Sequence, residues 1–120
     1  MYISVKDYNF GDSKIFIDPR RAEPIFEKIR DALKRDEEVT LSFSNLRIVI
    51  AAVLNVAIGK LYDPKLGLAD KIGSLLKITD ASENILDNIK IVKANAVKYY
   101  GDKELTIRRE ELLSKQGIER

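Results

Sequence analysis

Apolar and polar residues recur at regular spacing along most of the chain, so its elements can be predicted from this pattern alone. Residues 2–8 alternate, with Ile3 and Val5 on one side, which predicts a strand. The stretch "NFGDS" that follows has the composition of a turn, and residues 14–17, "KIFI", form a second short alternating segment. We expect the two strands to pair as a hairpin.

A helix is predicted after Asp18-Pro19, a pair that supplies a cap and a proline suited to the first helical position. Pro24 is costly inside a helix, so the regular helix should begin near Glu23. Six apolar residues then fall on one face: Ala22, Ile25, Phe26, Ile29, Ala32 and Leu33.

The next segment, "EEVTLSF" at residues 37–43, alternates like a strand with one buried face. After a turn at Ser44-Asn45, residues 48–62 are apolar on nearly all sides, which predicts a helix buried on several sides. The run is too short for a membrane span, which needs about 20 apolar residues, and Asn55 interrupts it.

Residues 75–79 predict a further strand, followed by a capping box with Asp80 as the cap and Glu83 reaching back. Gly101 is placed to end the last helix. That helix should bury Ile85, Ile89, Val92, Ala96 and Tyr99. We therefore expect one α/β domain over residues 1–101, with helices packed on a sheet, and a charged helical tail over residues 102–120.

The amino-acid composition excludes several kinds of catalytic and metal-binding chemistry. The 120 residues include no Cys and no His, which excludes disulfides, thiol nucleophiles, imidazole catalysis and Cys or His metal sites. No acidic cluster has metal-ligand spacing, so we expect no catalytic residues, no metal and no cofactor. The absence of Cys also fits a reducing cytoplasm. Lys and Arg number 21 against 19 acids, a net charge of +2 that is too small and too mixed to indicate nucleic-acid binding.

Two stretches carry a resemblance to a known family. "EEVTLSFSNLRIVIAAVLNVAIGKLY" and "LLKITDASENILDNIKIVKANAVKYY", with "PRRAEPIFEKI" before them, resemble STAS-like domains of unknown function, relatives of the sulphate transporter and anti-sigma-factor antagonist domain. The resemblance covers roughly residues 1–100. It implies a mixed sheet of about four strands with helices mainly on one face, and an activity of binding, not catalysis.

In STAS switch proteins, a partner kinase of the histidine-kinase-like ATPase fold phosphorylates a Ser at the start of a helix. The matching positions here are Ile50, Ala51 and Ala52, which have no hydroxyl. The resemblance therefore implies a regulatory protein-binding module that binds constitutively. Its partner would be such an ATPase or a second copy of the chain.

The residues expected to contact a partner lie at the end of the sheet and on the helix that follows it: Asn45, Leu46, Arg47, Ile48, Ala51 and Asn55. Two of them have plainer interpretations, Asn55 as a satisfied core amide and Arg47 as a solvated turn residue. An alternative function is the binding of a small anion, a nucleotide or phosphate, by Arg20, Arg21 or Arg47. Nucleic-acid binding through Arg108 and Arg109 is disfavoured by the two glutamates that follow them, and an enzyme is the least favoured class.

Overall fold

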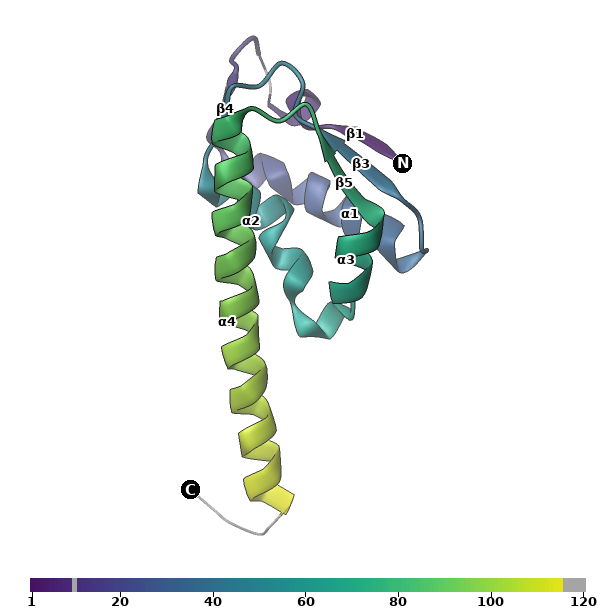
Figure 1. Ribbon diagram of the computed structural model, residues 1–120, viewed down its shortest axis with the longest axis vertical. Coiled ribbons are helices and arrows are strands. Elements are labelled where there is room, and N and C mark those ends of the chain that lie inside the picture. The colour runs from purple at the N-terminus through teal and green to yellow at the C-terminus, as the bar shows by residue number, and fades with distance from the viewer. Residues whose placement is uncertain (10, 116–120) are drawn as a thin grey trace.

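The computed structural model describes the backbone of residues 1–9 and 11–115, and side chains as far as residue 101. Its α-helices and strands, in chain order, are β1 (Tyr2–Ser4), β2 (Ile15–Phe16), α1 (Glu23–Lys34), β3 (Val39–Ser42), β4 (Ile48–Val49), α2 (Ala51–Ala57), α3 (Ala69–Leu75), β5 (Leu76–Thr79) and α4 (Glu83–Lys115). Four short 3-10 helices join them: η1 (Val5–Tyr8), η2 (Pro19–Ala22), η3 (Gly59–Tyr62) and η4 (Pro64–Leu66). The molecule is an α/β domain, as the sequence predicts (Figure 1).

The sheet differs from the expected mixed sheet of about four strands. Five strands form two sheets, one in the order β1-β3-β5 and one in the order β2-β4, and each pair is parallel. The predicted hairpin of β1 with β2 is therefore wrong. Strands β1 and β2 both precede α1, and they pair instead with β3 and β4, which follow it. The pairs are parallel because a helical crossover brings the chain back in the same direction.

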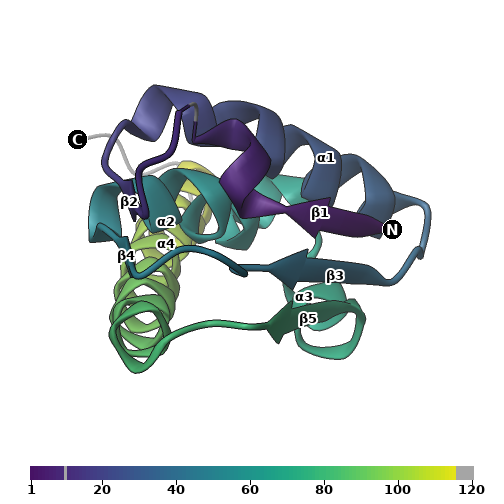
Figure 2. The same ribbon diagram turned by 90° about the horizontal axis from the view of Figure 1, so that it is seen from above.

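The two sheets are successive parts of one parallel arrangement. Figure 2 shows β2 and β4 beyond the carboxyl ends of β1 and β3, with the 3-10 helix η1 and the loop of residues 43–47 between the parts. The ladder of the three-stranded sheet ends with the pairs of Ser42 to Ser4 and to Thr79. Ser42, the last residue of β3, is fully buried, and its Oγ donates to Asp80 Oδ2 at 3.0 Å.

The core lies between the sheets and the helices. The predicted apolar face of α1 is entirely buried, and Ile3, Val39 and Leu41 supply the inner face of the three-stranded sheet. The 3-10 turn before α1 begins as predicted, with the Asp18 carboxylate accepting from the Arg20 backbone N–H, and α1 itself starts at Glu23. This part of the fold is thus dictated by local spacing and capping.

The segment predicted as one buried helix is divided into β4, α2 and η3. Its buried residues are Val49, Val53, Leu54, Ala57, Ile58, Gly59 and Leu61. Ala51, Ala52 and Asn55 are exposed, so the expectation of a helix buried on several sides is wrong. The first residues are drawn into a strand because the backbone N–H groups of Arg47 and Ile48 donate to Lys14 O.

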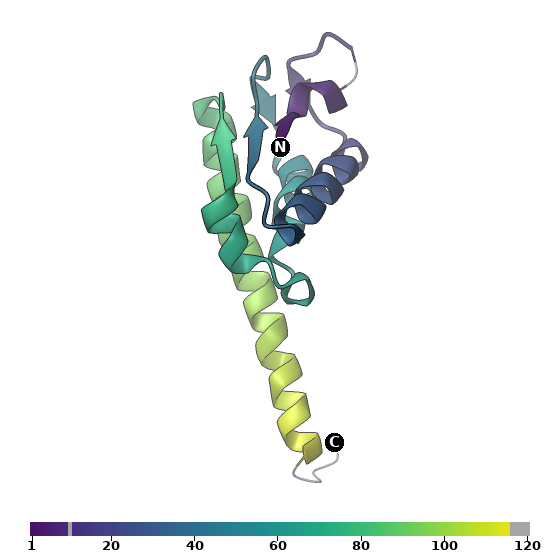
Figure 3. The ribbon, with the colours of Figure 1, turned by 90° about the vertical axis from the view of Figure 1, so that its right-hand side faces the viewer.

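Helix α4 also departs from its predicted ends. Ser82, not Asp80, caps it, since Ser82 Oγ accepts from the Ile85 N–H at 3.3 Å. The helix continues through Gly101 to Lys115, so the expected stop at Gly101 is wrong, although the helical nature predicted for residues 102–115 is confirmed. Four of its five predicted core residues are buried, but Tyr99 is 62% exposed. The part of α4 near its C-terminal end extends away from the body of the domain (Figures 1 and 3).

Candidate protein-binding surface

Hydrogen bonds tie the loop before β4 to two neighbouring segments, the one before β2 and the start of α4. The Arg47 N–H donates to Lys14 O at 2.8 Å, and Arg47 O accepts from Ser82 Oγ at 2.8 Å. One turn and a half further along α4, Asn88 Nδ2 donates to Val49 O at 3.1 Å. These bonds fix the backbone of the loop and leave the Arg47 side chain exposed.

The predicted partner-binding residues fall into two groups. Asn45 and Arg47 are exposed, and Asn45 adopts a left-handed backbone with φ of 66°, a conformation that asparagine tolerates in turns. Leu46 is only 6% exposed and belongs to the core, so its predicted contact with a partner is not available. Ile48 is half-buried.

Three isoleucines lie on the outer side of the two-stranded sheet, and we call them the isoleucine face: Ile15, Ile17 and Ile48. Ile50, which follows β4, is partly buried and packs against the core. Ile15 is paired with Ile48, and the Ile50 N–H continues the ladder by donating to Phe16 O at 3.2 Å. Phe16 and Val49 lie between them in sequence and point the other way, with no exposed surface. Ile15 and Ile17 are 45% and 62% exposed.

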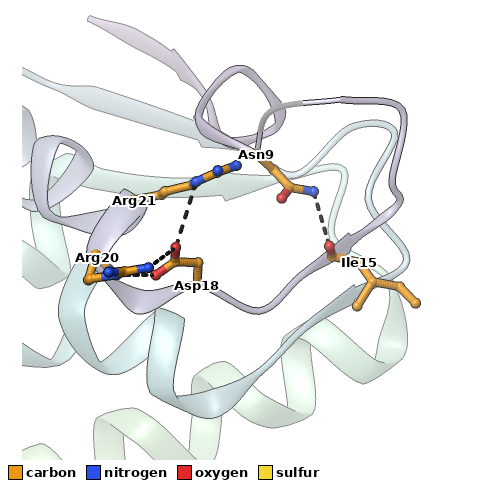
Figure 4. Close-up of polar contacts among 5 residues, drawn as sticks. All are labelled: Asn9, Ile15, Asp18, Arg20 and Arg21. Atoms are coloured by element: carbon orange, nitrogen blue, oxygen red, sulfur yellow. Dashed lines mark hydrogen bonds and ion pairs between the residues drawn. The ribbon is translucent and has the colours of Figure 1, made fainter.

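The free edge of β2 is closed against a further strand. Both backbone groups of Ile15 are occupied by side chains, because its N–H donates to Ser13 Oγ and its carbonyl accepts from Asn9 Nδ2 at 3.1 Å. Asn9 is itself buried and also donates to Ser13 O. Figure 4 shows the Asn9 amide directed at the Ile15 carbonyl while the Ile15 side chain points away. The exposed feature is therefore the apolar face, not the backbone edge.

Helix α2 adds small residues beside this face. Ala51 and Ala52, at the positions where the resemblance places a phosphorylated serine, are exposed on its first turn, and no side chain caps that turn. Asn55 lies one turn beyond Ala51 and is exposed, so its interpretation as a core amide is wrong. The nearby Ser42 hydroxyl is buried and bonded to Asp80, which removes it from reach of a kinase.

The arginines proposed for anion binding are already paired. Arg20 contacts both Asp18 oxygens at 3.1 Å, through Nε and a terminal nitrogen, and Arg21 Nε lies 3.7 Å from Asp18 Oδ2. Figure 4 shows both guanidinium groups turned toward this carboxylate. Hydrogen bonds from the Arg20 side chain, then its backbone, lower the pKa of Asp18 below its ordinary value. An internal carboxylate thus occupies the position that an external anion would need, and Arg47 belongs to a different segment.

The nucleic-acid alternative stays a prediction. Arg108 and Arg109 lie outside the residues whose side chains are described. Within the described part of the chain, no group of three or more acidic residues is arranged to hold a metal ion. No described helix combines the length and apolar character needed to cross a membrane.

Sequence reasoning missed the isoleucine face. The signal was present in "KIFI" and "RIVI", where three successive apolar residues leave no polar side. Such a run is typical of a strand buried on both faces, and the sequence does not show that one face is left uncovered.

The family comparison agrees with this architecture. The profile described as "STAS-like domain of unknown function (DUF4325)" matches residues 21–86, from the turn before α1 to the first turn of α4. The chain belongs to this family. Comparisons with curated proteins and with solved structures found no match.

Proposed function

We propose that this domain is a non-catalytic protein-binding module whose partner covers the isoleucine face, Arg47 and the exposed first turn of α2. The observation that carries the proposal is the exposure of Ile15 and Ile17 on a strand whose backbone edge is closed. An edge that cannot accept another strand favours a partner that packs side chains onto the face.

The energetics suit a specific contact. Fully burying an isoleucine side chain contributes about 1.5–3 kcal/mol, so covering the exposed parts of Ile15 and Ile17 supplies a useful apolar centre. Arg47 comes directly before Ile48 and is exposed, which places a cation at the rim. A planar guanidinium there selects a partner with a carboxylate opposite it.

The partner we propose presents an apolar patch bordered by acidic residues. In view of the family, a histidine-kinase-like ATPase is one candidate and a second copy of the chain is the other. Ala51 and Ala52 cannot accept phosphate, so this interaction would be constitutive and would not be released by phosphorylation at those positions.

The test is site-specific photo-crosslinking in the native cell at position 17, with position 91 as the matched control. Ile91 lies on α4 and is 54% exposed, similar to Ile17. A discrete adduct at position 17 that is lost in Arg47→Glu and absent at position 91 supports the proposal. The mass of the adduct distinguishes a second copy from another protein.

Two outcomes would contradict the proposal. One is equal crosslinking at positions 17 and 91, which would indicate a non-specific apolar surface. The other is an adduct at position 17 that is unchanged in the variants Arg47→Glu and Ala52→Glu. Both substitutions are at exposed sites, so the fold is expected to remain intact.

A further inference from the structure

A recess lies away from the isoleucine face, between the α2–η3 segment and α4. It encloses about 410 Å³, within the range of small-molecule sites. Its lining comprises two carboxamides, two phenols, one ammonium group and one small residue: Asn55, Asn95, Tyr99, Tyr100, Lys60 and Ala96. None of the lining residues belongs to the isoleucine face.

Gly59 leaves room for the first carboxamide. A Cβ on this buried glycine would lie 2.5 Å from Asn55 Oδ1 and 3.3 Å from Val92 Cγ1. The absence of a side chain lets Asn55 Oδ1 lie against Gly59 while Val92 of α4 packs close to the same glycine. The Asn55 amide therefore stands at one wall of the recess.

Lys60 does not make the recess an anion site. Its Nζ lies 2.6 Å from Glu23 Oε2 and 4.5 Å from the centre of the Phe26 ring. The charge is thus compensated by α1, and no carboxylate is among the lining residues. Burial raises the pKa of the Tyr100 phenol, with Asp63 and Tyr99 adding to the effect, so the phenol remains a neutral donor near pH 7. The described lining is therefore polar and presents no uncompensated charge to a ligand.

The aromatic side offers a stacking surface. Tyr99 and Tyr100 meet edge to face, with ring centres 5.0 Å apart and planes at 77°. Tyr99 is nevertheless 62% exposed, which is high for a tyrosine that has a neighbouring ring. A flat ligand ring could cover this surface while its edge meets the carboxamides.

We propose that this recess binds the base of a purine nucleoside, with its ring on Tyr99 and its hydrogen-bonding edge on Asn55 and Asn95. A carboxamide offers one donor and one acceptor side by side, which matches the adjacent donor and acceptor of adenine. Aromatic side chains stack well on any base. A sugar would also stack, but its many hydroxyl groups favour carboxylate acceptors, which this lining does not supply.

The experiment is a titration of the full chain with adenosine, followed by the side-chain amide signals of asparagine in NMR spectra. We expect Asn95→Ala and Tyr99→Ala each to weaken binding by at least about tenfold, since losing a stacked ring alone has effects of that size. Asn84→Ala and Tyr2→Ala are the matched controls, because both residues are exposed and lie away from the recess. They should change affinity less than about twofold.

Several results would overturn the proposal. These are no binding of adenosine at millimolar concentration, equal losses in the control variants, or binding of maltose in place of adenosine. Competition by inorganic phosphate would also overturn it, because the site would then recognise charge. Binding of adenosine does not depend on the isoleucine face, so failure here leaves the proposed protein contact untouched.

Discussion

The two sheets of this domain present very different outer faces. On the three-stranded sheet, the outward positions in register are Tyr2, Thr40 and Lys77, followed by Ser4 and Thr79 on either side of Ser42, which is itself buried. Each of these six residues has a polar group. On the two-stranded sheet, the outward positions are the three residues of the isoleucine face.

The inner faces, by contrast, are alike. Leu41 on one sheet and Phe16 on the other are both completely buried. The outer face of the three-stranded sheet is thus polar, as expected for a face that meets water. The isoleucine face departs from that pattern, and an exposed apolar patch of this kind is typical of a contact surface.

The largest effect should come from removing the inner side of β2. Phe16→Ala leaves a cavity and should lower the free energy of unfolding by about 3–5 kcal/mol. Ile17→Ala, one residue along and 62% exposed, should change it by less than about 0.5 kcal/mol. Urea denaturation of both variants measures the difference. Similar losses would mean that Ile17 is part of the core, and the contrast between the two faces of β2 would collapse.

Asn9→Ala should have the next largest effect. It removes two hydrogen bonds from a buried amide, to Ser13 O and Ile15 O, and should cost about 1–3 kcal/mol. The Ser13 hydroxyl still bonds the N–H and the carbonyl of Ile15 in this variant, so the β2 edge is freed only when Ser13→Ala is added. The double variant should self-associate at concentrations where the parent chain does not. Light scattering measures this, with Asp12→Ala in the same loop as control, and an unchanged mass of the double variant would show that Asn9 and Ser13 do not guard the edge.

Ser82→Ala tests the support of β4 from α4. It loses the cap on the Ile85 N–H and the bond to Arg47 O, and should cost about 1 kcal/mol. Ser82→Asp retains a cap but cannot donate to Arg47 O, so comparison of the two melting curves separates the roles. If Asp restores full stability, the bond to Arg47 O contributes nothing.

The smallest effect concerns Asp18, the residue that caps η2. Its pKa is lowered by Arg20, so its contribution to stability is present above its unfolded value of about 3.8 and is lost as pH falls through the lower folded value. Asp18→Asn should therefore melt slightly below the parent chain at pH 6, and the two should converge below pH 3.8. Thermal melts across pH 2–7 test this, with Asp12→Asn as control. A difference that persists at pH 2 would require another cause.

Local signals in the sequence account for much of the fold. Strand β3, strand β5 and the buried face of α1 follow from periodicity and caps, which depend on neighbouring residues. The pairing of β1 with β3 does not, because it joins segments on either side of a helix. The turn composition of residues 9–13 favoured a hairpin, yet the Asn9 side chain uses its hydrogen bonds to close the edge of β2.

The candidate surface was only partly predictable. Asn45 and Arg47 were placed correctly as exposed residues, since polar residues in a loop after a strand seldom turn inward. Leu46 was misplaced because a single apolar residue in a loop gives no period from which to infer its direction. The pairing of Arg20 with Asp18 depends on side-chain orientation across a turn, and no sequence pattern records it.

The parallel pairing of strands has a consequence for how the chain folds. Tyr2 pairs with Thr40 and Thr40 with Lys77, separations of 38 and 37 residues (40 minus 2, 77 minus 40). Such contacts close large loops before they gain any hydrogen bonds, so we expect folding to be slow compared with a helical bundle of this size. During synthesis, β2 must wait for residue 48 to emerge before it has a partner. Until then Ile15 and Ile17 on one face and Phe16 on the other are open to solvent, so the segment is a target for a chaperone that binds extended apolar peptides.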